Sequence, residues 1–109
     1  MTAPVNLGRQ TLPGLIAQWA RIADYIERRE TDGHDVPADV AVRHEIATRL
    51  RTRPTSAETR ELLAELDAQF MAGTIESLTC IAGADAAVAA GWMPTREWYY
   101  WRVPVGGGA

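Results

Sequence analysis

The chain contains 109 residues, of which 47% are hydrophobic and 23% are charged. This length supports one domain whose core needs no disulfide or structural metal, and the composition excludes a disordered chain. Eleven basic residues, all of them Arg, stand against 14 acidic residues, and the net charge is −3. This charge excludes a protein whose whole surface wraps nucleic acid or an anionic membrane, but it is compatible with a local basic patch.

Cys80 is the single cysteine, so the sequence excludes an intrachain disulfide and a multi-cysteine metal site. The first residues lack the basic and apolar regions of a secretory signal, and no run approaches the ~20 apolar residues of a membrane span. Asp32, His34 and Asp35 share one loop but lack further ligands at fixed spacing. We therefore expect no bound metal, no cofactor, no membrane contact and a cytoplasmic location.

The clearest helix of the sequence begins at Leu12. Apolar residues recur from there to Ile26 at the three- and four-residue spacing of a buried helix face. Thr11 is a suitable N-cap, and Asp32-Gly33 supplies residues that end a helix. We expect this helix to contribute the longest stripe of the core.

Two further helices are predicted from the residues at their ends. The second spans about 37–52, between a capping Asp35 and the proline at position 54. The third follows the capping-box pattern Thr55-Ser56-Ala57-Glu58 and ends before Gly73, where a C′ glycine belongs. Leucines and a phenylalanine at positions 62, 63, 66 and 70 give this third helix its core face.

A fourth helical region is predicted from about Thr74 to Ala90. Gly83 interrupts it, so two short helices meeting there are the alternative, and Gly91 ends it. The second half is nearly all Ala. Because small side chains permit close approach, we expect this half to pack tightly against a neighbouring helix.

The predicted fold is all-α: residues 1–109 form a single helical domain, a small bundle of four to five helices. We expect an irregular arm at residues 1–10 and a flexible tail at residues 105–109. An aromatic C-terminal segment packs across the bundle. We favour extended backbone over helix for its residues 96–103, because flanking prolines leave a span too short for a robust helix. The nearest partner for such a strand is the arm at residues 5–7.

Aromatic residues concentrate near the C-terminus: five of the eight lie between Trp92 and Trp101. Some of these rings must pack on the bundle or on another molecule, and Trp, Tyr and Arg often dominate binding energy at interfaces. Two hypotheses remain, a segment that closes the core and a surface that docks a partner. They are compatible if inner rings anchor the segment. In extended backbone Trp98 and Trp101 face opposite ways, so one is buried and the other available. The predicted partner-binding residues are Trp92, Trp98, Tyr99, Tyr100, Trp101 and Arg102.

Residues 84–103 also suggest a degenerate helix-turn-helix. An Ala-rich helix reaches the Gly91 turn, and a recognition helix beginning near Thr95 brings Arg96 and Arg102 toward DNA. The match is poor, because a recognition helix usually exposes polar side chains to base edges and this one is aromatic.

Charged residues form two opposite groups in the middle of the chain. A patch for nucleic acid or an acidic partner is predicted at Arg43, Arg49, Arg51 and Arg53. The alternative, which we favour, pairs these arginines with acidic residues of the third helix. Carboxylates at positions 58, 61 and 65 form a solvated stripe, and His44 is expected to be solvated.

No nucleotide-binding, hydrolase or metalloprotease motif occurs in the sequence, so we expect no enzymatic activity. The preferred function is a small accessory or regulatory protein that binds another protein, or a second copy of itself, through the aromatic C-terminal surface. The alternative is a DNA-binding regulator that uses the degenerate helix-turn-helix at residues 84–103.

Overall fold

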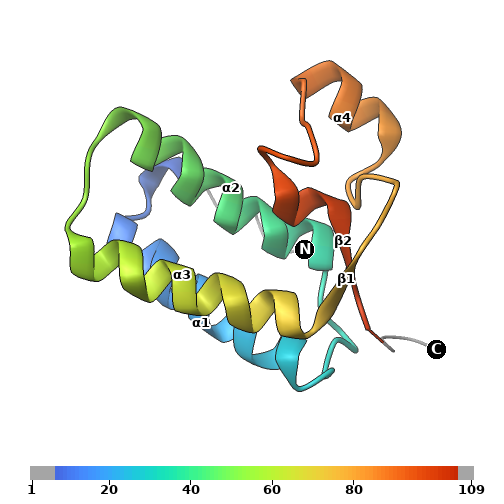
Figure 1. Cartoon of the computed structure of the whole chain (residues 1–109), viewed down its shortest axis with the longest axis horizontal. Coiled ribbons are helices and arrows are strands. Elements are labelled where there is room, and N and C mark those ends of the chain that lie inside the picture. The colour runs from blue at the N-terminus through green and yellow to red at the C-terminus, as the bar shows by residue number, and fades with distance from the viewer. Residues whose placement is uncertain (1–6, 106–109) are drawn as a thin grey trace.

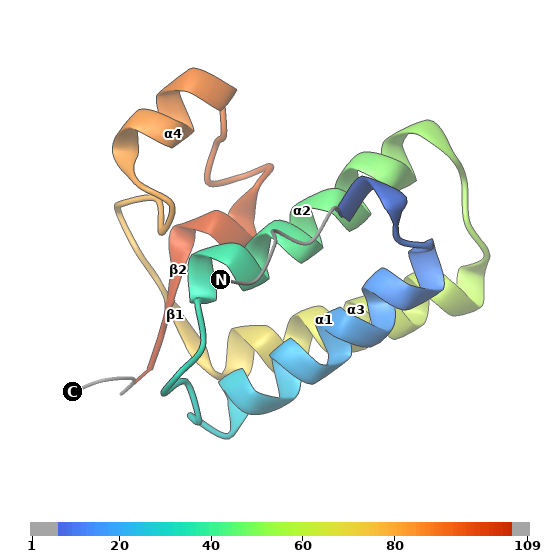
Figure 2. The same cartoon turned by 180° about the vertical axis from the view of Figure 1, so that it is seen from behind.

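The computed structural model describes residues 7–105. Three long helices, α1 (Leu12–Glu27), α2 (Val36–Thr52) and α3 (Ala57–Ala72), form the body of the molecule. The shorter α4 (Ala84–Ala90) stands out from this body (Figures 1 and 2). Two 3₁₀ helices, η1 (Leu7–Arg9) and η2 (Trp98–Trp101), complete the helical part. The prediction that the chain is mostly helical is confirmed.

The all-α prediction needs one correction, a small sheet. Strand β1 (Thr74–Glu76) pairs antiparallel with β2 (Arg102–Pro104), with Ile75 opposite Val103. The predicted helix at residues 74–83 is therefore wrong, and only α4 remains of that region. The observed partner of the C-terminal strand is β1, whereas the prediction named the N-terminal arm. Its residues 1–6 lie outside the described part of the chain.

The three long helices begin where the sequence predicts, because each has a polar cap. Thr11, Asp35 and Ser56 each accept a hydrogen bond from the backbone amide three residues further on. These bonds satisfy amides that lack partners inside the helix. The predicted capping box needs a correction, because Thr59 and not Glu58 is the third residue after the cap.

The core centres on α1, which packs against both α2 and α3. Trp19 is fully buried, and its ring centroid lies 4.9 Å from that of Phe70 on α3. The prediction that Leu62 belongs to the core face of the third helix is wrong, because 45% of this residue is exposed. The buried residues of α1 confirm the long stripe: Leu15, Ile16, Trp19, Ile22, Ala23, Tyr25 and Ile26.

Gly73 and Gly91 end helices for different reasons. Gly91 has a φ of 71°, in the left-handed region that glycine adopts most readily. Gly73 follows α3 directly, as predicted, but its φ of −97° lies outside the left-handed region that a C′ glycine commonly adopts. A Cβ at Gly73 would lie 2.3 Å from the carbonyl oxygen of Ile26. Glycine at this position therefore permits the ends of α1 and α3 to meet.

The ends of the described chain are held by hydrogen bonds. The Leu7 carbonyl in η1 accepts a bond of 2.8 Å from Arg49, so part of the predicted irregular arm is a short helix. The amide of Val105 donates to the Gly73 carbonyl at 2.9 Å and continues the sheet. Residues 106–109, the rest of the predicted flexible tail, lie outside the described part.

Candidate functional site

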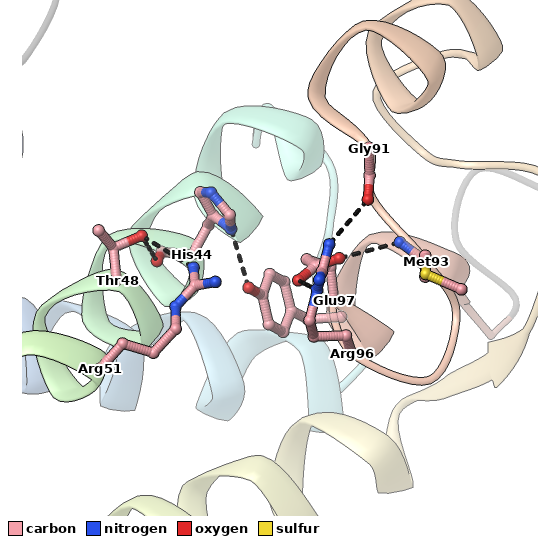
Figure 3. Close-up of polar contacts among 8 residues, drawn as sticks. His44, Thr48, Arg51, Gly91, Met93, Arg96 and Glu97 are labelled. Carbon is pink, nitrogen blue, oxygen red and sulfur yellow. Dashed lines mark hydrogen bonds and ion pairs between the residues drawn. The ribbon is translucent and has the colours of Figure 1, made fainter.

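The aromatic segment is attached to α2 through His44. Its Nδ1 lies 2.9 Å from the hydroxyl oxygen of Tyr99, and the ring also contacts Trp92 and Tyr100. Burial lowers the pKa of His44, and the positive charge of Arg51 lowers it further. Figure 3 shows His44 and Arg51 on α2 facing the segment that contains Glu97. The prediction of a solvated His44 is therefore wrong.

Glu97 is a buried carboxylate that shapes the turn before η2. It is 2% exposed, and it accepts hydrogen bonds from the Met93 amide at 2.9 Å and from Nε of Arg96 at 2.6 Å (Figure 3). Burial alone raises the pKa of Glu97. These bonds, together with the charges of Arg96 and Arg51, outweigh burial and hold the pKa below its usual value. The carboxylate therefore fixes the turn as an anion.

The four arginines of the predicted basic patch differ in exposure, and only two of them are fully available at the surface. Arg43 is buried and makes a two-bond ion pair with Asp67 on α3, at 2.8 and 2.9 Å. Arg49 pairs with Glu45 one turn away and is only partly exposed. Arg51 and Arg53 are exposed. The patch is thus half its predicted size, because Arg43 is paired with Asp67 and Arg49 with Glu45.

The six predicted partner-binding residues also separate by burial. Tyr99 and Tyr100 are buried, and burial raises the pKa of each to about 12. They therefore anchor the segment and do not present a contact surface. Trp92 is half-buried and stacks on Tyr100 with 3.9 Å between ring centroids.

Trp98 and Trp101 differ from the prediction for extended backbone. Both lie on η2, three residues apart, where a 3₁₀ helix places side chains on one side. Both are half-buried, so neither is the fully buried ring expected for one of them. Arg102 donates hydrogen bonds to the Thr74 hydroxyl at 2.8 Å and to its carbonyl at 3.0 Å. Its guanidinium therefore joins β2 to β1.

Two adjoining grooves flank Trp101, and Leu78 and Trp101 line both of them. The larger, of about 640 Å³, also includes Met71 and Trp98. The smaller, of about 460 Å³, extends to Val88 on α4. We call this region the Leu78 surface and define it by the side chains Met71, Leu78, Val88, Met93, Trp98 and Trp101.

The most exposed side chains of the Leu78 surface were missed by the sequence analysis. Leu78 is 99% exposed, Val88 83%, Met93 53% and Met71 40%. The sequence placed Leu78 in a helix predicted from Thr74 to Ala90, of which the part before Gly83 does not form. Backbone bonds from Ser77 to the Trp101 carbonyl and from Ile81 to the Tyr100 carbonyl hold its loop against η2. No local sequence signal predicts these long-range bonds.

The second α-helix of the predicted helix-turn-helix is not formed. Residues 94–96 make a turn, and η2 and β2 follow after Glu97. The Arg96 guanidinium binds Glu97 and the Gly91 carbonyl. The arrangement after α4 therefore lacks the helix that would enter a DNA groove.

Within residues 7–105, the structure shows neither a cluster of three or more possible metal ligands nor a helix long and apolar enough to cross a membrane. His44 and Glu97 are each bonded to neighbouring protein groups, and neither lines the grooves described above. Comparisons with protein-family models, curated proteins and solved structures find no significant match to the chain.

Proposed function

We propose that the protein is a non-enzymatic binding module, a small accessory or regulatory factor that binds a protein partner through the Leu78 surface. One observation carries the proposal: four large apolar side chains are 40–99% exposed and gather around two grooves that share Trp101. A contiguous apolar patch of this kind typically marks an interaction site.

The energetics favour a partner of apolar character. Complete burial of an exposed Leu, Val or Met side chain contributes roughly 1.5–3 kcal/mol. Trp and Met are also enriched at protein interfaces, and Trp is frequent among the residues that dominate binding. An aromatic segment that closes the core is compatible with a surface that docks a partner, since the buried Tyr99 and Tyr100 anchor the segment. Trp98 and Trp101 are left to line the grooves.

The DNA-binding alternative has lost much of its support. It requires a recognition helix after Gly91 and a cluster of available arginines. Residues 95–104 provide a turn, a short 3₁₀ helix and a strand, while Arg43 and Arg49 are engaged with Asp67 and Glu45. Two exposed arginines, at positions 51 and 53, are a small fraction of the phosphate contacts of typical DNA-binding proteins.

Site-specific photo-crosslinking tests the proposal. A photoreactive amino acid replaces Leu78 in the protein expressed in its source cells, and a matched protein has it at Asp85, an exposed position on α4 outside the Leu78 surface. We expect a discrete protein adduct from position 78 and not from position 85. The mass of the adduct separates a second copy of the chain from a different partner. Equal labelling at both positions, or none at position 78, would contradict the proposal.

A further inference from the structure

A third groove, also apolar, lies between α1 and α3, near the end of the bundle where both helices begin. It has a volume of about 380 Å³, and no charged residue lines it. Ala17 and Ala20 contribute small side chains from α1, and Leu62 and Leu66 contribute larger ones from α3. Leu62 is 45% exposed there. The groove is separate from the Leu78 surface, with which it shares no lining residue.

The α3 side of this groove is acidic. Glu58 lies four residues before Leu62 and Glu65 three residues after it, so helix geometry places both carboxylates beside that leucine. Glu61 continues the acidic face one turn before Glu65. All three are exposed, and within residues 7–105 none has a side-chain hydrogen bond or ion pair. Their charges are therefore not neutralised by the fold.

The α1 side carries different charges. Arg21, one turn beyond Ala17, is exposed. Asp24 is paired with Arg28, and Glu27 accepts a hydrogen bond from Gln69. A ligand in the groove consequently meets an apolar floor, three free carboxylates along α3 and one free guanidinium on α1.

The length of the groove limits what it accepts. From Leu12 to Ala20 along α1 the rise is roughly 12 Å, about two helical turns. Small side chains on the floor permit close approach of a backbone. A short amphipathic helix meets these requirements when its apolar residues recur over two turns and occupy the groove.

We propose that this groove binds a two-turn amphipathic helix of a partner protein, with apolar residues at positions i, i+3 or i+4, and i+7 and with Arg or Lys beside them facing α3. The basic residues complement the free carboxylates of Glu58, Glu61 and Glu65. Such complementarity contributes mainly to specificity and to the association rate, so the salt concentration should affect it.

A library of displayed helical peptides tests this inference. Its apolar positions vary among Leu, Ile, Met, Phe and Ser, and its flanking positions vary among Arg, Glu and Ser at equal frequency. Selection on the wild-type protein, with counter-selection on Leu62→Glu, should enrich Arg at the flanks and apolar residues at the anchors. No enrichment, or enrichment of Glu at the flanks, would overturn the inference.

The enriched peptide is then measured against matched variants. Glu58→Gln combined with Glu65→Gln should weaken binding about ten-fold at low salt and much less at high salt, while Asp85→Asn, which removes one exposed charge on α4, should leave it unchanged. Equal weakening by Asp85→Asn would show a general charge effect and would reject the site. A dimer of the protein alone that Leu62→Glu dissociates would identify a second copy as the occupant and would also overturn the inference. Leu78→Glu should not affect the peptide, so failure here is distinct from failure of the proposed function.

Discussion

Replacement of Asp67 by Ala removes the acceptor that joins three helices. Oδ1 of Asp67 accepts hydrogen bonds from Nε1 of Trp19 at 3.0 Å and from Nε of Arg43 at 2.8 Å. Oδ2 accepts a third hydrogen bond, from Nη2 of Arg43 at 2.9 Å. The Arg43 side chain is 10% exposed and that of Asp67 is 15% exposed. The substitution therefore leaves a buried guanidinium without its counter-charge and a buried indole N–H without an acceptor.

Breaking such a pair costs about 3–5 kcal/mol of unfolding free energy, because the remaining charge stays buried. For a domain of this size that loss corresponds to a decrease of about 12–20 °C in Tm. Urea denaturation with fluorescence detection measures the free energy. The control is Asp24→Ala, which breaks an exposed pair with Arg28 and should cost less than about 1 kcal/mol.

A double-mutant cycle tests the mechanism. Arg43→Met removes the buried charge, so the combination with Asp67→Ala should cost about 2 kcal/mol less than the sum of the single variants. A loss below about 1 kcal/mol for Asp67→Ala, or strict additivity in the cycle, would refute the reasoning that this pair is a buried link between the helices.

Three further predictions concern stability and pH. Gly73→Ala should cost about 2–3 kcal/mol in a denaturation experiment because its Cβ meets a backbone carbonyl, whereas Gly91→Ala should cost about 1 kcal/mol for its positive φ alone; equal costs would contradict this. Burial raises the pKa of Asp39 from 3.8 to about 6, so the folded state binds its proton more tightly and stability should fall as the pH rises from 4 to 6. Asp39→Asn should abolish that fall and gain ~1 kcal/mol at pH 7, since the group is only partly buried; an unchanged pH profile would contradict it. The lowered pKa of His44 has the opposite effect on stability, because the folded state binds this proton less tightly than the unfolded state does. In the Asp39→Asn background, stability should therefore decrease as the pH falls below 6.5, and His44→Gln should remove that decrease. A decrease that persists in His44→Gln would assign it to another group.

The sequence predicts α1, α2 and α3 well because their signals are local. Each segment begins with a polar cap, and α1 and α3 also have a recurrent apolar face; these signals act before any distant contact forms. The structure of the region after Gly73 does not depend on local signals of this kind. Strand β1 has three residues, and its partner β2 begins 26 residues after β1 ends, so its hydrogen bonds depend on the path of the whole C-terminal segment. Residue patterns at 74–76 resemble a continuing helix and do not encode that pairing.

The candidate site was predicted in part for a related reason. The concentration of aromatic residues pointed to the segment that lines the candidate site, but burial of each ring depends on its neighbours on α2 and α3. Arg43 shows the same limit. A basic residue within an arginine-rich window is predicted to lie at the surface, and only the structure shows that Arg43 is paired with Asp67. Leu78 shows the reverse. An apolar residue is expected in the core, but Leu78 lies in a loop that leaves its side chain exposed.

The most direct test of the proposed function measures the photo-crosslink at position 78 in proteins that also carry Val88→Glu or Met93→Glu. Both side chains are more than half exposed, so these substitutions should leave Tm nearly unchanged. If the Leu78 surface binds the partner, each should reduce the adduct about thirty-fold, the equivalent of about 2 kcal/mol at a binding hot spot. Asp32→Asn, in the turn after α1 and outside all three grooves, serves as the control and should not change the yield. An adduct that persists in both glutamate variants at full Tm would contradict the account.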